Sequence, residues 1–304
     1  VFQCREGQPF VLAGSGTLAM DCAGANLVEP GDKALVINTG YFSERFAVLL
    51  ARYGAQVTQV DAAVGGRPAL EDVQAALQRE RYKLVTITHV DTSTAVIADV
   101  PGIAALARSH GALVVVDGVC SVAGEELRMD EWGVDLALTA SQKAIGVPPG
   151  LALLVAGPRA MEAFARRTTP VLNYYGDWNN WLPVMQAYAA RRPSYFGTPA
   201  VNLVFALNIA LGQILAEGLE KRFARHQLLS RMCQAGIAAL GLGQVPLQAE
   251  YAAHTLTAPR YPAGVNGADF LARVSQAGVV LAGGLHPAIK AEYFRIGHMG
   301  AHTP

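Results

Sequence analysis

The stretch ALVVVDG, residues 112–118, has five consecutive apolar residues followed by Asp117 and Gly118. A short apolar run without alternation is typical of a strand that is buried on both faces, and the glycine marks its end. Four further runs are similar: ALVINTG at 34–40, LVTITHV at 84–90, DLALTAS at 135–141 and LALLVAG at 151–157. Such strands predict a mostly parallel sheet.

Amphipathic segments alternate with these strands. Residues 42–55, 70–80 and 103–111 carry apolar side chains at helical spacing, which predicts an α/β fold with helices on both faces of the sheet. From Thr198 to about Leu240 the pattern is nearly all helical, as expected of one long helix that links two domains. We therefore predict a large domain over residues 1–220 and a smaller C-terminal α/β domain over 221–304.

The composition excludes several classes of function. The 304 residues are 52% hydrophobic and 16% charged, with 24 basic and 24 acidic residues. This balance predicts a large core and argues against a nucleic-acid groove or a polybasic membrane patch. The four cysteines are far apart, which favours reduced thiols in an intracellular compartment over a disulfide framework or a metal site. The apolar runs are too short to predict a transmembrane helix.

The segment AGSGTLAM, residues 13–20, places two glycines just before a predicted helix. Backbone N–H groups at such a turn can converge on an anion, and the helix dipole attracts negative charge. The segment lacks the spacing of a dinucleotide site or of a P-loop. A tight turn into the helix explains the glycines equally well.

Two charged residues follow neighbouring predicted strands. Asp117 ends one strand and Lys143 follows the next, so both belong to the edge of the sheet where ligands gather. Either could be ordinary, Asp117 as a helix cap and Lys143 as an exposed lysine. Together with the glycine turn they match what pyridoxal phosphate needs: a Schiff-base lysine, an acidic partner for the ring nitrogen and a phosphate cradle. Phe42 could stack on the ring.

Seven blocks, in this order, resemble the class V aminotransferases: AGSGT, NTGYFSERF, THVDTSTAV, VVDGVCS, SQKAIGVPPG, SYFGTP and FRIGHMG. The resemblance extends from Pro9 to Gly300 and is strongest to the alanine–glyoxylate and serine–glyoxylate group, especially its fungal-type members. It implies a transferase of fold type I that depends on pyridoxal phosphate, with the cofactor in the large domain. It also implies a homodimer whose active sites are shared between subunits. Relatives are longer at both ends, so we expect residues before Val1 and a last helix after Pro304.

The resemblance assigns roles to individual residues. Lys143 matches the Schiff-base lysine and Asp117 the partner of the ring nitrogen, so these two are the predicted catalytic residues. Phe42 takes the ring-stacking position, which is often tryptophan in relatives. Arg295 matches the arginine that binds the substrate carboxylate, a task that suits a planar guanidinium.

The other residues that the resemblance implies bind the cofactor. The phosphate would contact Ser15, Gly16, Thr17 and Gln142. Thr92 would lie near the ring hydroxyl. Tyr195 and Thr198 would reach the phosphate of the neighbouring subunit. No metal ligands are predicted.

The function implied is transfer of the amino group of L-alanine, or of L-serine, to glyoxylate, which yields glycine and pyruvate or hydroxypyruvate. Since no second arginine stands out for a dicarboxylate, aspartate and glutamate are weaker donor candidates. A cysteine desulfurase or another lyase of the same fold is the alternative, although no cysteine occurs between Cys120 and Cys233. A non-catalytic binding protein fits less well, because Lys143, Asp117 and Arg295 are all present. The sequence does not distinguish cytosol, mitochondrion and peroxisome.

Overall fold

The computed structural model describes residues 1–303 and is built around a seven-stranded sheet of order β1-β9-β8-β7-β4-β2-β3. The parallel strands β3, β2, β4, β7 and β8 lie side by side, and β9 pairs antiparallel with both β8 and β1. The strands are β1 (Gln8–Ala13), β2 (Lys33–Ile37), β3 (Gln56–Val60), β4 (Leu84–Thr88), β7 (Leu113–Asp117), β8 (Leu136–Ala140) and β9 (Leu151–Ala156). The predicted mostly parallel sheet is confirmed.

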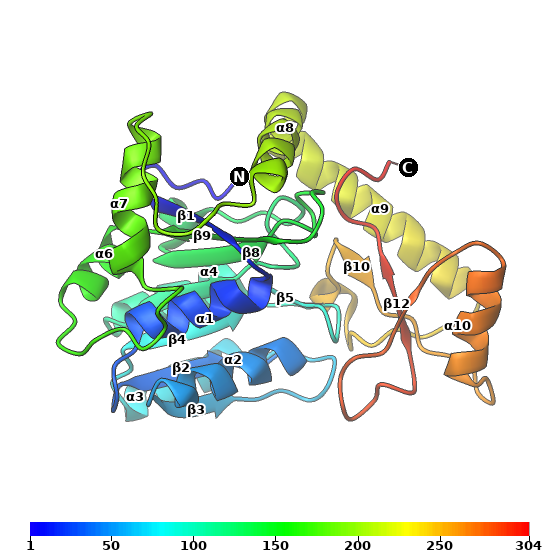
Figure 1. Cartoon of the computed structure of the whole chain (residues 1–304). Coiled ribbons are helices and arrows are strands. Elements are labelled where there is room, and N and C mark those ends of the chain that lie inside the picture. The colour runs from blue at the N-terminus through cyan, green and yellow to red at the C-terminus, as the bar shows by residue number, and fades with distance from the viewer. Residues whose placement is uncertain (304) are drawn as a thin grey trace.

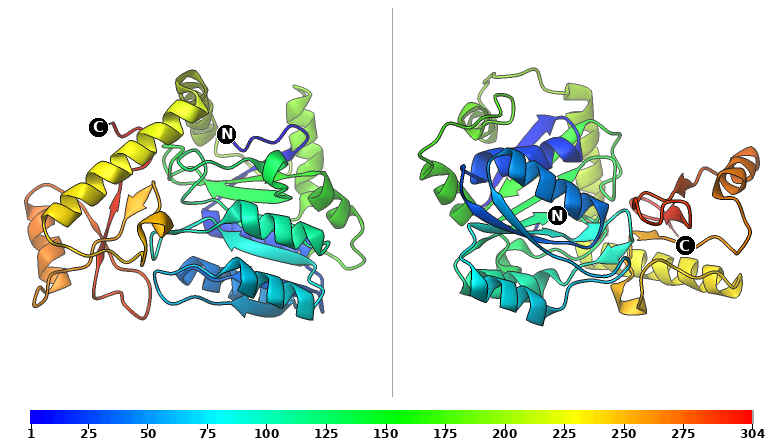
Figure 2. Two further views of the ribbon diagram at one scale, coloured as in Figure 1. Left: turned by 180° about the vertical axis from the view of Figure 1, so that it is seen from behind. Right: turned by 90° about the horizontal axis from the view of Figure 1, so that it is seen from below.

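Helices cover both faces of this sheet (Figures 1 and 2). One face packs against α1 (Gly16–Leu27), α2 (Tyr41–Arg52), α6 (Pro158–Ala165) and α7 (Trp178–Ala189). The other packs against α3 (Leu70–Arg79), α4 (Val100–Ser109), α5 (Met129–Trp132) and α8 (Val201–Glu217). The central strands β4, β7 and β8 are buried along their whole length, which explains why their sequences show no alternation.

The expected single long helix is two helices. The chain bends by 89° between α8 and α9 (Leu219–Ala239). Gly218 lies between them with φ +83°, a conformation that glycine adopts without steric cost. The prediction failed because apolar periodicity continues across this glycine and does not reveal the bend.

A smaller unit follows α9, which runs diagonally from α8 toward it (Figures 1 and 2). Its antiparallel sheet has the order β10-β12-β11, with β10 (Leu256–Thr257), β11 (Ala282–Gly283) and β12 (Phe294–Gly297). The remaining elements are α10 (Gly267–Gln276), the 3₁₀ helix η1 (Ala249–Tyr251) and the two-stranded pair β5 (Val90–Asp91) and β6 (Val96–Ile97). The boundary at residue 220 stays a prediction.

Within residues 1–303, no single helix is both long and apolar enough to cross a membrane. The pair α8 and α9 meets the length and composition criteria only when both helices are taken together across their bend.

Candidate active site

A cavity of about 220 Å³ lies at the carboxyl ends of β4, β7 and β8, the edge where ligands bind in open α/β sheets. Five separate segments line it, namely the turn after β1, the start of α2, the segment after β4 and the loops after β7 and β8. The lining residues are Ser15, Gly16, Thr17, Met20, Phe42, Arg45, Val90, Thr92, Asp117, Val119, Cys120, Gln142 and Lys143.

The turn from β1 into α1 presents unused hydrogen-bond donors to this cavity. Ser15 is the residue before the helix, and its side chain makes no capping hydrogen bond. The first turn of α1 carries no acidic side chain. A Cβ on Gly16 would lie 2.7 Å from a methyl carbon of Val119, so only glycine lets the backbone come this close to the loop after β7. Free N–H groups, a free hydroxyl and a positive helix end fit a phosphate group.

Asp117 ends β7 and is 3% exposed. Its Oδ1 accepts a hydrogen bond from the backbone N–H of Val119 at 2.9 Å. The pKa of Asp117 is raised to about 7, mainly by burial and also by the negative charge of Asp91, while the hydrogen bond from Val119 and the charges of Lys143 and Arg45 oppose the shift. A buried carboxylate without a cationic partner is costly. A cationic group of a ligand would therefore suit Asp117 in this cavity.

Lys143 lies in the tight loop that joins β8 to β9. Ser141 fixes the base of the loop, because its Oγ donates to the carbonyl of Pro148 at 2.7 Å and accepts from Leu151 N–H at 3.2 Å. The carbonyl of Lys143 accepts from Gly146 N–H at 2.9 Å. The loop backbone is thus held at both ends, and the half-buried Lys143 side chain lines the cavity.

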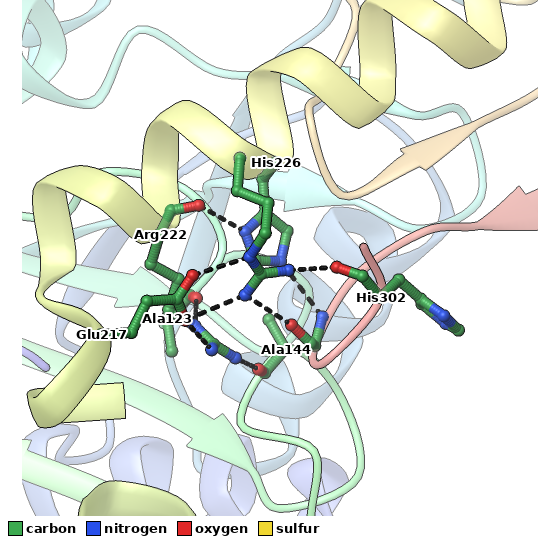
Figure 3. A network of polar contacts seen from close by, with 8 residues as sticks. Ala123, Ala144, Glu217, Arg222, His226 and His302 are labelled. Atoms are coloured by element: carbon green, nitrogen blue, oxygen red, sulfur yellow. Dashed lines mark hydrogen bonds and ion pairs between the residues drawn. The ribbon is translucent and has the colours of Figure 1, made fainter. Parts of the chain in front are cut away.

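A buried arginine on α9 supports the loops that carry both charged residues (Figure 3). Arg222, 5% exposed, donates from Nε to the carbonyl of Ala123 at 2.7 Å and from Nη2 to that of Ala144 at 2.6 Å. Its Nη1 binds Glu217 at 2.8 Å. Ala123 follows the Asp117 segment and Ala144 is next to Lys143, so one guanidinium joins both loops to the helix that leads to the small unit.

The fully buried carboxylate of Asp91 holds the start of α2. Its Oδ2 accepts from the N–H groups of Phe42 at 3.0 Å and of Ser43 at 3.3 Å. Its Oδ1 accepts from the N–H of Ser93 at 2.9 Å and from the Ser93 hydroxyl at 2.6 Å. These bonds satisfy free donors at the helix end and fix the backbone of Phe42 beside the cavity.

Most of the predicted site residues meet in the cavity, but three do not line it. The eight that line it are Ser15, Gly16, Thr17, Phe42, Thr92, Asp117, Gln142 and Lys143. Arg295 lies on β12 near the rim, where its Nε donates to the carbonyl of Gly283 at 2.8 Å and its Nη1 contacts the carbonyl of Thr92 at 3.5 Å. Tyr195 is 73% exposed, its hydroxyl lies 3.3 Å from that of the exposed Thr198, and neither residue lines the cavity.

Sequence reasoning missed Arg45, Asp91 and Arg222. Arg45 lies three residues after Phe42 on the same helix, and this spacing was a usable signal. Asp91 is an acidic residue that directly follows an apolar strand, which also pointed to a buried polar role. Nothing in the sequence marked Arg222, because its partners are backbone carbonyls distant along the chain.

A two-unit α/β architecture with a lysine and a buried carboxylate at one sheet edge suits an aminotransferase, and it also suits a lyase of the same fold. The sequence model of the family described as "Aminotransferase class-V" matches residues 10–299. The chain therefore belongs to the class V aminotransferase family.

Three comparisons illustrate the similarity. Alanine–glyoxylate aminotransferase 1 of Saccharomyces cerevisiae is 42% identical over 97% of this chain and 78% of its own length. L-aspartate–glyoxylate aminotransferase of Paracoccus denitrificans is 35% identical over 100% of this chain and 76% of its own. The crystal structure of alanine–glyoxylate aminotransferase from Nostoc sp. superposes with a TM-score of 0.93 at 33% identity, covering 100% of this chain and 79% of that one. The expected fold type is confirmed.

Proposed function

We propose that this aminotransferase uses pyridoxal phosphate to move the amino group of L-alanine, or of L-serine, to glyoxylate, which forms glycine. The observation that carries the proposal is the cavity that brings Lys143, Asp117 and the free start of α1 together. The yeast relative, named for alanine and glyoxylate, supports this choice of substrates.

The residues present fit the cofactor. Ser15, Gly16 and Thr17 would hold its phosphate at the positive end of α1, with Gln142 beside them. Phe42 would stack on the ring, and Asp117 would keep the ring nitrogen protonated. When bound, pyridoxal phosphate supplies an aldehyde that reacts with amines and a ring that withdraws electrons from the substrate α-carbon.

The protein contributes proton transfer and orientation. Lys143 Nζ would hold the cofactor through its aldehyde and would move a proton at the substrate α-carbon as general base and acid. Arg295 would bind the substrate carboxylate at the rim with a planar pair of N–H donors. Thr92, whose carbonyl contacts Arg295, would lie near the ring hydroxyl.

The lyase alternative is not favoured. Cys120 lines the cavity, but it is 1% exposed and burial raises the pKa of its thiol. Because the thiolate is the nucleophile, a buried neutral thiol is poorly suited to attack sulfur. We assign Cys120 a packing role.

We also propose a homodimer in which Tyr195 and Thr198 contact the phosphate of the other subunit. Both residues are exposed and lie close before α8. The outer face of α8 exposes Phe205 at 69%, Ile209 at 63% and Leu215 at 66%. A contiguous apolar helix face of this kind marks an interaction surface. Phe205→Lys should shift the sedimentation coefficient from dimer to monomer, whereas an unchanged coefficient would argue for another interface.

An intracellular location is the last part of the proposal. It is supported by the four cysteines, none of which forms a disulfide within residues 1–303.

The first experiment is an absorption spectrum of the protein incubated with pyridoxal phosphate. We expect a visible band from the lysine-bound cofactor, which L-alanine should bleach and glyoxylate should restore. If L-alanine leaves the band unchanged, alanine is not the amino donor. Serine would then be tested as the donor, followed by aspartate and cysteine. Absence of any band would overturn the cofactor assignment.

Replacement of the lysine tests the chemistry. Lys143→Ala should abolish turnover, because no other described residue of the cavity carries an amine that could form the link. Folding should be preserved, since the half-buried side chain makes no ion pair among residues 1–303. The measurement is the steady-state transamination rate of the wild type and of Lys143→Ala, compared at matched thermal stability. Wild-type turnover in the variant would reject the catalytic role of Lys143.

A further inference from the structure

Arg45 is a cation of the cavity to which the preceding assignments give no role. It projects from the first turns of α2 and lines the cavity together with Thr17 and Phe42. Its Nη1 donates to Thr17 Oγ1 at 3.1 Å, and its Nη2 donates to the hydroxyl of Tyr41 at 3.2 Å. The guanidinium carbon lies 4.9 Å from the centroid of the Phe42 ring and 5.0 Å from that of Tyr41.

These contacts orient the guanidinium without neutralising it. Arg45 has no carboxylate partner within 4.0 Å among residues 1–303. Its neighbours are two hydroxyl oxygens and two ring faces, which are groups that hold a planar cation in place. An arginine kept in one orientation and left without a counterion is a suitable site for an anion.

The charges that line the cavity indicate which anion. Arg45 and Lys143 are the two cations among its lining residues, and Asp117 is its single carboxylate. In the proposed function, Lys143 binds the aldehyde and is not available to the phosphate. A phosphate monoester carries about 1.5 to 2 negative charges at neutral pH. Arg45 then remains as the one fixed side-chain cation of the cavity.

The position of Arg45 agrees with this role. Thr17 belongs to the turn at the start of α1, whose unused donors fit a phosphate, and the guanidinium of Arg45 already contacts the Thr17 hydroxyl. The same guanidinium covers Phe42, the ring-stacking candidate. Arg45 thus spans the two places where the phosphate and the ring of one ligand would be held.

We propose that Arg45 binds the phosphate group of pyridoxal phosphate and balances its charge. This proposal rests on the proposed function, because it assigns a further binding residue to the same site. It predicts that Arg45 distinguishes the phosphorylated cofactor from pyridoxal, which has the same ring and aldehyde but no phosphate.

The test compares the affinities of Arg45→Gln and the wild-type protein for pyridoxal phosphate and for pyridoxal, measured by absorbance titration. A lost charge-assisted contact should weaken pyridoxal phosphate binding by about 10- to 100-fold. Pyridoxal binding should change by less than about threefold. Arg52→Gln is the matched control, because Arg52 is exposed in the last turn of the same helix and does not line the cavity.

Three results would overturn the proposal. An equal loss of affinity for both ligands would show that Arg45 contacts the cofactor ring or supports the fold, and does not bind the phosphate. An unchanged affinity for pyridoxal phosphate would exclude the contact. A selective loss of activity with aspartate, at unchanged cofactor affinity, would make Arg45 a receptor for a second substrate carboxylate. A wild-type protein that does not bind pyridoxal phosphate would instead reject the proposed function, and this inference with it.

Two further measurements cover the case in which Arg45→Gln folds poorly. Arg45→Lys keeps a positive charge but loses the planar stacking. Its preference for pyridoxal phosphate over pyridoxal should therefore lie between those of the wild type and of Arg45→Gln. Inorganic phosphate alone should raise the thermal midpoint of the wild-type protein without added cofactor more than that of Arg45→Lys. Equal shifts in the two proteins would contradict the proposal.

Discussion

At the scale of single residues, the site depends on a carboxyl group in an unusual environment. Asp117 is buried at the end of β7, and burial raises its pKa to about 7. In the folded protein without cofactor it therefore binds a proton at pH values where the unfolded chain does not. A carboxyl group of this kind contributes stability that is present below about pH 4 and is lost as the pH rises to about 7.

Asp117→Asn should remove this pH dependence. Between pH 4 and 7 the free energy of unfolding of the cofactor-free wild-type protein should fall by up to about 4 kcal/mol relative to that of the variant. Urea unfolding at pH 4, 5, 6 and 7 measures the difference. The control is Asp72→Asn, because Asp72 is an exposed carboxylate on α3. This variant should show the same pH dependence of the free energy of unfolding as the wild type. Parallel curves for wild type and Asp117→Asn would show that Asp117 titrates normally.

Residue by residue, the sequence predicted the positions at strand ends best. Asp117 and Lys143 could be placed because parallel strands bring their carboxyl ends to one edge, so chain order alone predicts proximity. Arg45 and Asp91 carried weaker signals, the helical spacing from Phe42 and the position after an apolar strand, because periodicity does not determine where α2 begins. Tyr195 and Thr198 are predicted to act across a subunit boundary, so their assignment follows from the family resemblance and not from the position of a strand end.

At the scale of elements, the start of α2 is the most specialised part of the site. Gly40 precedes it with φ +155°, and a Cβ there would lie 2.8 Å from the Asp91 carboxyl carbon and 2.6 Å from the Ser93 hydroxyl oxygen. The absence of a side chain at Gly40 lets the Asp91 carboxylate reach the helix N–H groups. The position of Phe42 therefore depends on a residue that does not itself line the cavity.

Asp91→Asn should weaken both the fold and cofactor binding. The amide presents an N–H group where an acceptor is needed, so the free energy of unfolding should drop by about 2–3 kcal/mol. The affinity for pyridoxal phosphate should fall because Phe42 is displaced. Asp99→Asn is the control, since Asp99 caps α4 through Gly102 N–H at 3.0 Å, far from the cavity. It should lose little stability, because asparagine caps a helix as well as aspartate does, and it should lose no cofactor affinity. The same affinity loss in both variants would refute the positioning role.

At the scale of the whole molecule, α9 links the large sheet to the smaller unit through a polar network (Figure 3). Arg222 binds both active-site loops and Glu217. Arg225, one turn further, also binds Glu217, at 2.6 Å, and donates to the carbonyl of Gly300 at 3.1 Å. The segment after β12 and the loop after Lys143 are thus held by neighbouring arginines on one helix.

Arg222→Lys should loosen the lysine loop. A lysine cannot reach both carbonyls and Glu217 at once, so buried acceptors lose their donors and the free energy of unfolding should fall by about 2–4 kcal/mol. Hydrogen exchange of residues 142–150 should accelerate relative to that of β4. Arg231→Lys, exposed on the same helix, should change neither quantity. Unaltered exchange in Arg222→Lys would mean that the loop is stable without the arginine.

The pairing of β1 with β9 has a consequence for how the protein is made. β1 hydrogen-bonds to β9 along its whole length, from Gln8 opposite Ala156 to Ala13 opposite Leu151. During synthesis at about 5–20 residues per second, β1 leaves the ribosome roughly 7–30 s before its partner strand does. The turn after β1 carries the expected phosphate contacts Ser15, Gly16 and Thr17. In nascent chains, β1 therefore has no strand to pair with until β9 has emerged, however early the other strands pair.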